Sequence, residues 1–130
     1  SRGLGDVYKR QLGEPREQVF KTLVTVGKSG GYTVFVIPVA EELDRKKAAA
    51  AVGEKSLELL PVKELFPLTG YVRGGCTAIG MKKQFPTVLH VSAMERDTIF
   101  VSGGRLGLQI QLKPEDFLAA CGGVWKDVTV

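Results

Sequence analysis

The chain has 130 residues, is 44% hydrophobic and 25% charged, and carries a formal net charge of +4. These values predict one globular domain whose core needs no metal or disulfide, and the apolar runs are far too short to cross a bilayer. The two cysteines, Cys76 and Cys121, lie far apart, and His90 is the single histidine. We therefore expect no metal site, and the lack of disulfide and signal-peptide patterns indicates the cytoplasm.

The first residues need separate treatment. Asp6 to Gln11 reads Asp-Val-Tyr-Lys-Arg-Gln, which is what the transposon end used in sequencing-library preparation encodes when translated. We expect residues 1–11 to be non-native adaptor read-through, and residues 12–130 to be the native domain with its N-terminal part missing. Without that segment the 18 basic and 14 acidic residues become 15 and 13, a net charge of +2. Global charge is then weak evidence for an anionic partner.

A β-hairpin is the first element expected in the native part. Residues 19–26 and 32–37 are rich in β-branched and aromatic residues, and five residues, 27–31, form a glycine-rich turn between them. Lys21 lies inside the first of these strands. Its side chain either faces solvent or presents a cation to a pocket, and the sequence leaves both possibilities open.

Short helices and further strands follow. Asp44 is placed to cap a helix over residues 45–52 that ends at Gly53. The remaining pattern predicts a helical turn at 62–66, strands at 56–60, 87–91, 98–102, 108–112 and 124–128, and a helix at 113–121. Strand pairs interspersed with short helices predict an α+β fold: a single domain with a mixed, mostly antiparallel sheet or open barrel flanked by short helices.

The segment Thr69–Lys83 has an unusual composition, with four glycines among two lysines and one arginine. Glycine is costly to order, so such a loop usually allows the backbone to approach a ligand or another strand closely. The spacing from Gly75 to Gly80 resembles a phosphate-binding loop, but Met81 stands where that motif needs lysine. A dinucleotide-binding fingerprint is also absent.

The sequence offers no nucleophilic triad. His90 lies in an alternating apolar strand and is expected to be structural, and Cys121 is expected in the core. Cys76 is either a nucleophile or a small residue that lines a pocket. What remains is a set of backbone amides, hydroxyls and cations: Thr22, Thr77, Ser102, Lys21, Arg73, Lys82 and Lys83. Such groups stabilise an oxyanion and bind phosphate but lack a general base, so they suit an ester that brings its own nucleophile.

Four separated motifs together resemble one family. They are Val19-Phe-Lys-Thr-Leu23, Gly70-Tyr-Val-Arg-Gly-Gly-Cys76, Gly80-Met-Lys-Lys83 and Val101-Ser-Gly-Gly-Arg105. In this order and spacing they resemble the YbaK/EbsC family, free-standing relatives of the editing domain of bacterial prolyl-tRNA synthetase. The resemblance covers residues 12–128.

The resemblance implies the editing-domain fold and a cytosolic deacylase for mischarged tRNA, with Cys-tRNA(Pro) as substrate and no metal or organic cofactor. The substrate thiol would attack its own ester, and prolyl-tRNA synthetase is a possible partner. The implied catalytic residues are Lys21, Gly74 and Ser102. The resemblance further implies substrate contacts from Thr22, Gly75, Cys76, Thr77, Gly103 and Gly104, and tRNA contacts from Arg73, Lys82 and Lys83.

Three departures from the family pattern bear on specificity. Thr77-Ala78 stands where the family has Ser-Pro, Gln109 stands where it has an acidic residue, and a first strand with a pocket tyrosine is expected to be missing. Two alternatives therefore stay open. One is a deacylase for alanine- or serine-charged tRNA, and the other is a non-catalytic module that binds aminoacyl-tRNA or another ligand.

Overall fold

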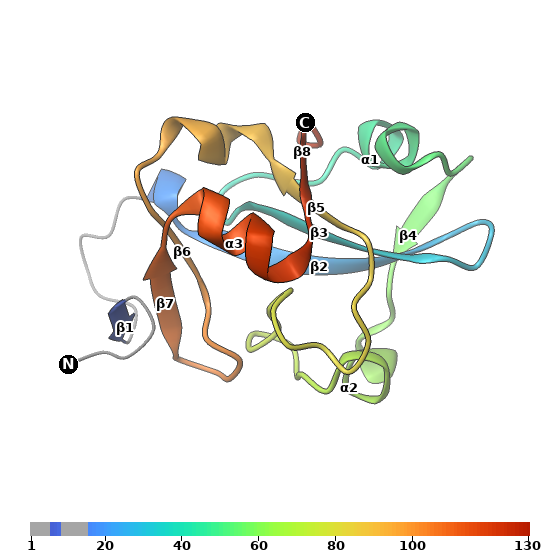
Figure 1. Cartoon of the computed structure of the whole chain (residues 1–130). Helices are drawn as coiled ribbons and strands as arrows, with labels where there is room; N and C mark the ends of the chain where they lie inside the picture. The colour runs from blue at the N-terminus through green and yellow to red at the C-terminus, as the bar shows by residue number, and fades with distance from the viewer. Residues whose placement is uncertain (1–5, 9–15) are drawn as a thin grey trace.

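The computed structural model describes residues 6–8 and 16–130, and these form two open sheets with short helices around them (Figure 1). The larger sheet is mixed and has the strand order β4-β2-β3-β5-β8, and the smaller is antiparallel with the order β1-β7-β6. The strands are β1 (Asp6–Tyr8), β2 (Phe20–Gly27), β3 (Tyr32–Pro38), β4 (Leu57–Leu59), β5 (Thr87–His90), β6 (Ile99–Ser102), β7 (Gln109–Leu112) and β8 (Val124–Lys126). The predicted α+β fold with a mixed, mostly antiparallel sheet is confirmed, and the sheets do not close into a barrel.

Both predicted hairpins are present. Strands β2 and β3 pair antiparallel, as do β6 and β7. The parallel pairs, β3 with β5 and β5 with β8, were not predicted. Parallel neighbours need long crossover connections, and here each crossover is a composite of short elements that does not resemble a simple β-α-β unit.

Two apolar clusters cover the two faces of the larger sheet. On one face, Val34 and Val36 of β3 pack with Phe117 and with residues of the glycine-rich loop, among them Cys76. On the other face, Phe35 and its neighbours pack against the helix α1 (Arg45–Val52). Successive residues of a strand point to opposite faces, so β3 is buried on both sides. The glycine-rich loop (residues 69–83) is therefore anchored in the core through Cys76, Ala78 and Met81.

The helices are α1 (Arg45–Val52), α2 (Val62–Thr69) and α3 (Pro114–Cys121), with 3-10 helices η1 (Arg16–Gln18) and η2 (Val91–Glu95). The predicted caps of α1 are confirmed: the Asp44 carboxylate accepts hydrogen bonds from the Lys46 and Lys47 backbone N–H groups at 3.0 and 3.1 Å, and Gly53 has φ +73°. No helix among the described residues is long and apolar enough to span a bilayer.

Helix α2 continues past the point predicted from sequence. We expected it to stop at Phe66 because Pro67 cannot donate a hydrogen bond, yet it runs to Thr69. Two hydrogen bonds close the last turn, from Thr69 Oγ1 to the Leu65 carbonyl at 2.8 Å and from the Gly70 N–H to the Phe66 carbonyl at 2.8 Å. These bonds stabilise the last turn although Pro67 has no N–H to donate.

Strand β1 falls within the segment predicted to be adaptor read-through. It pairs antiparallel with β7, with Asp6 opposite Gln111 and Tyr8 opposite Gln109. The pairing extends the smaller sheet by one strand. The non-native origin of residues 1–11 stays a prediction, which resequencing of the gene would test. The rest of the segment lies outside the described residues.

Candidate functional site

A cavity of about 420 Å³ lies where β2, the glycine-rich loop and the β6–β7 hairpin meet. This volume is in the usual range for small-ligand sites. The cavity is lined by Phe20, Lys21, Thr22, Leu23, Val39, Arg73, Gly74, Cys76, Ser102, Gly107, Leu108 and Gln109. Six of these, Lys21, Thr22, Arg73, Gly74, Cys76 and Ser102, were predicted as site residues from sequence. They come from three segments far apart in the chain.

Lys21 lines the cavity, so its side chain does not simply face bulk solvent. Its Nζ donates a hydrogen bond to the Val39 carbonyl at 3.3 Å, just beyond the end of β3. No carboxylate pairs with Lys21 among the described residues. The ammonium is therefore held by one neutral acceptor and keeps donors for a ligand.

Thr22, the neighbour of Lys21 on β2, has a buried hydroxyl. Its Oγ1 makes no hydrogen bond to any described residue, although the atom is inaccessible to solvent. A buried polar atom without a partner is costly, and such atoms are often completed by water or a ligand. Thr22 also lines the cavity, but a ligand would contact this buried hydroxyl only after a local shift of the atoms that cover it.

The glycine-rich loop and the tip of the β6–β7 hairpin approach each other closely. A Cβ at Gly75 would lie 2.8 Å from Arg105 Cα, so only glycine fits there without a shift of the backbone. Gly74 has φ +86°, and a Cβ on it would lie 2.6 Å from Leu106 Cδ2. The predicted reason for the glycines, close backbone approach, is thus borne out by contact with another part of this chain.

Ser102 lies at the end of β6 opposite Gln109 of β7, and both line the cavity. The Ser102 hydroxyl oxygen accepts a hydrogen bond from the Gly104 N–H at 3.1 Å. A serine hydroxyl that accepts one hydrogen bond still has its own proton to donate. The arrangement orients this donor at the cavity wall.

Cys76 lines the cavity as a neutral thiol. It is 7% exposed, and burial raises the pKa of its thiol to about 11, opposed by a weaker effect of a hydrogen bond with Thr69. Nucleophilic cysteines have a lowered pKa because the thiolate is the reactive form. Of the two roles that the sequence left open, the structure supports pocket lining rather than nucleophilic attack.

The remaining predicted site residues do not line the cavity. Gly75, Gly103 and Gly104 are not among its lining residues. Thr77 is buried, and its Oγ1 accepts a hydrogen bond from the Ile79 N–H at 3.4 Å. Ala78 is fully buried. The Thr77-Ala78 departure therefore affects the support of the loop and not the cavity lining.

Lys82 and Lys83, at the end of the glycine-rich loop, also lie outside the cavity lining. Lys82 Nζ donates to the Pro67 carbonyl at 3.4 Å and lies 5.6 Å from the centre of the Phe66 ring. It covers the C-terminal end of α2, where a cation is favourable. Lys83 is exposed. Contacts of either lysine with tRNA stay a prediction.

Val39, Gly107, Leu108 and Gln109 line the cavity, and the sequence did not single them out as site residues apart from noting Gln109 as a departure. Val39 directly follows β3. Leu108 lies just after the tip of the β6–β7 hairpin, and its N–H donates a hydrogen bond to the Arg105 carbonyl at 3.2 Å. The register of the two hairpins is the signal that could have found them, because it places 39 near 19–21 and 109 opposite 102.

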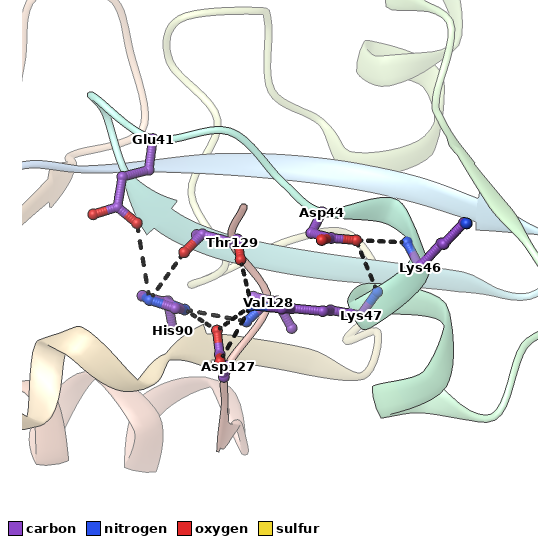
Figure 2. Close-up of polar contacts among 8 residues, drawn as sticks. All are labelled: Glu41, Asp44, Lys46, Lys47, His90, Asp127, Val128 and Thr129. Carbon is purple, nitrogen blue, oxygen red and sulfur yellow. Dashed lines mark hydrogen bonds and ion pairs between the residues drawn. The ribbon is translucent and has the colours of Figure 1, made fainter.

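His90 is remote from this cavity and fully engaged, as Figure 2 shows. Its Nδ1 accepts the Val128 N–H at 3.2 Å, and its Nε2 lies 3.2 Å from Thr129 Oγ1. The Glu41 and Asp127 carboxylates lie 3.9 and 4.0 Å from the ring nitrogens. These contacts tie the C-terminal segment to β5, in agreement with the predicted structural role. The described residues hold no cluster of three or more His, Cys, Asp or Glu that could bind a metal.

A search against protein-family models matches residues 6–120 to the aminoacyl-tRNA editing domain. The chain belongs to this family. A relative from Enterococcus faecalis (strain ATCC 700802 / V583), named "Putative Cys-tRNA(Pro)/Cys-tRNA(Cys) deacylase EbsC", is 50% identical over 118 residues, which are 91% of this chain and 72% of the relative. The resemblance to the YbaK/EbsC family stated from the motifs is confirmed.

Solved structures show the same fold. One, titled "Crystal structure of a putative trans-editing enzyme for prolyl tRNA synthetase", has a TM-score of 0.86 at 24% identity and covers 96% of this chain and 86% of its own. Another, the hypothetical protein APE2540, has a TM-score of 0.84 at 26% identity and covers 92% of this chain and 79% of its own. The editing-domain fold is thus shown independently of the sequence motifs.

Proposed function

We propose that this editing domain is a deacylase that hydrolyses the ester of mischarged tRNA, with Cys-tRNA(Pro) as its substrate. The observation that carries the proposal is the gathering of Lys21, Thr22, Gly74 and Ser102 around one cavity. These residues supply a cation, two hydroxyls and a backbone segment, which are the groups needed to hold a phosphate and an ester carbonyl.

Among the described residues, the cavity lining contains no carboxylate and no histidine. Cys76 is protonated at neutral pH because of its raised pKa. The described lining therefore offers no group that could act as a general base near neutral pH. A substrate that carries its own nucleophile removes the need for one, and a cysteinyl ester is such a substrate.

The reaction proceeds in two steps. The substrate sulfur attacks its own ester carbonyl, a C–S bond forms, the C–O bond to the ribose breaks, and the ribose oxygen takes up the proton lost by the thiol. Water then opens the cyclic thioester and cysteine is released. Lys21 binds the terminal phosphate or ribose, while Ser102 and the Gly74 backbone position the carbonyl.

The proposed partners of this domain follow from its substrate. Prolyl-tRNA synthetase, which produces the mischarged tRNA, is the protein expected to deliver it, and the reaction takes place in the cytoplasm. Arg73 lines the cavity and is exposed to solvent, so it is placed to contact a phosphate near the ester. The mechanism uses no metal and no organic cofactor.

Release of amino acid from purified tRNA tests the proposal. Wild-type protein is incubated with Cys-tRNA(Pro), with Ala-tRNA(Pro) and Ser-tRNA(Pro), and with Cys-tRNA(Pro) whose thiol has been methylated. We expect rapid release of cysteine only, and none from the methylated substrate. Equal release of alanine or serine would show that the domain also deacylates tRNA charged with these amino acids. Binding without release would identify a non-catalytic module.

A further inference from the structure

The outer edge of the cavity is formed by two loop tips, which we call the rim: residues 72–74 of the glycine-rich loop and residues 105–107 of the β6–β7 hairpin. Arg73, Gly74 and Gly107 also line the cavity, so rim and cavity are continuous. The close approach of Gly75 to the Arg105 backbone holds the two tips together. The Gly75 N–H bonds to the Val72 carbonyl at 3.0 Å and closes the first tip. The rim is therefore a defined surface and not two independent loops.

The rim exposes two apolar side chains beside the cavity. Leu106 is 68% exposed and Val72 is 46% exposed. Leu106 packs over Gly74, as the 2.6 Å approach to a Cβ at that glycine shows. An apolar side chain that is exposed beside a binding cavity is a candidate contact for a ligand's flat or apolar part.

Cations flank these apolar side chains. Arg73 and Arg105 are exposed, and neither makes an ion pair with any described residue. Among the described residues, neither the cavity lining nor the rim (residues 72–74 and 105–107) includes an acidic residue. Local charge is thus one-sided here although the net charge of the whole chain is small. Such a surface favours a polyanion.

We infer that the rim binds the single-stranded 3′ end of the tRNA, with Leu106 and Val72 against the face of a base and Arg73 and Arg105 on the phosphates. The inference rests on the proposed function: when the aminoacyl group fills the cavity, its ribose and the nucleotides before it must pass over the rim. Single-stranded nucleic acid is generally held by cations along the backbone and by side chains packed on base faces. Arg105, Leu106 and Val72 thereby become substrate-binding residues.

Two substitutions on the exposed rim test the inference, Arg105→Gln and Leu106→Ser. Matched controls are Lys126→Gln, an exposed cation on β8, and Met94→Ser, a 61% exposed apolar residue on η2. The first readout is binding of the uncharged RNA tetranucleotide ACCA, followed by NMR titration at several salt concentrations. The second is KM and kcat for Cys-tRNA(Pro).

We expect each rim variant to weaken binding of the tetranucleotide about five- to tenfold and to raise KM rather than lower kcat, as loss of a base or phosphate contact does. Arg105→Gln should also reduce the slope of log affinity against log salt by about 0.7. The two control variants should bind like wild type.

Unchanged tetranucleotide binding and unchanged KM in both rim variants would overturn the inference. So would equally tight binding of a tetraglutamate peptide without dependence on Leu106, because the rim would then select charge alone. The RNA readout needs no turnover. Leu106-dependent RNA binding by a protein that releases no cysteine would refute the deacylase function and support RNA binding by the rim. Cysteine release that neither rim variant affects would support the deacylase function and refute RNA binding by the rim.

Discussion

The molecule holds its cations in two different ways, in the cavity and at the edge formed by α1 and the C-terminal segment. At the α1 edge, Lys47 Nζ lies 3.4 Å from Asp127 and 2.9 Å from the Thr129 carbonyl (Figure 2). Arg45, also on α1, pairs with Glu58 of β4 at 2.9 Å. At the cavity, Lys21 and Arg73 have no carboxylate partner among the described residues. Charge that is already paired supports the fold, and charge left unpaired beside a cavity is available to a ligand.

Polar side chains also differ between the two regions. His90 uses both ring nitrogens within the protein, whereas Thr22 Oγ1 in the cavity has no partner among the described residues. The His90 ring is thus satisfied by the fold, whereas the Thr22 hydroxyl beside the cavity is not. Each prediction below tests one side of this difference, from the largest expected effect to the smallest.

The thiol of Cys76 should react slowly for a cysteine beside an open cavity. Because burial raises its pKa to about 11 from 9.0, its thiolate fraction near pH 8 should be about 100-fold lower than that of an ordinary thiol. The rate of alkylation by iodoacetamide, measured by mass spectrometry in a Cys121→Ala background, should keep rising with pH up to about 11. A rate that already levels off near pH 8 would show an activated cysteine and reopen the nucleophile role.

Gly75→Ala should damage the cavity through the backbone. Its Cβ would meet Arg105 Cα at 2.8 Å, and separation of the two loop tips should cost about 1–3 kcal/mol of stability. Urea unfolding measures this loss, and deacylation should fall with it. Gly122→Ala is the comparison, since Gly122 has φ +66° but open space around its Cβ and should lower stability without changing activity per folded molecule. Normal activity in Gly75→Ala would contradict the close-approach explanation.

His90→Ala should destabilise the fold without affecting the cavity. It leaves the Val128 N–H without its acceptor, which should cost about 1–3 kcal/mol in urea unfolding. His90→Asn retains an acceptor in place of Nδ1 and should recover part of that loss. Both variants should release cysteine from Cys-tRNA(Pro) at the wild-type rate. A fall in kcat with unchanged stability would give His90 a catalytic role that the geometry does not show.

Local chemistry was enough to predict much of the fold. The β2–β3 hairpin follows from a glycine-rich turn between β-branched runs, and the α1 caps follow from Asp44 and Gly53. The parallel pairing of β3 with β5 could not be predicted, because it depends on how a long composite crossover returns to the sheet. The extent of α2 beyond Pro67 depends on a threonine hydroxyl whose bond no helix propensity describes.

For the site, residue types were predictable and surroundings were not. The motifs identified Lys21, Gly74 and Ser102, which the fold brings to one cavity. The sequence could not show that Lys82 covers α2, since that contact depends on the path of the loop after Gly80. It also could not separate the two roles of Cys76, because the pKa of a thiol depends on burial that only the packed structure defines.

The most direct test compares an unpaired cation with a paired one. Lys21→Ala removes the cavity ammonium, and Lys47→Ala removes an ammonium bound to Asp127 and to the Thr129 carbonyl. With Cys-tRNA(Pro), kcat/KM of Lys21→Ala should fall by about 100-fold or more, whereas Lys47→Ala should keep wild-type activity and lose at most about 1 kcal/mol of stability. Equal activity of Lys21→Ala and wild type would contradict the account.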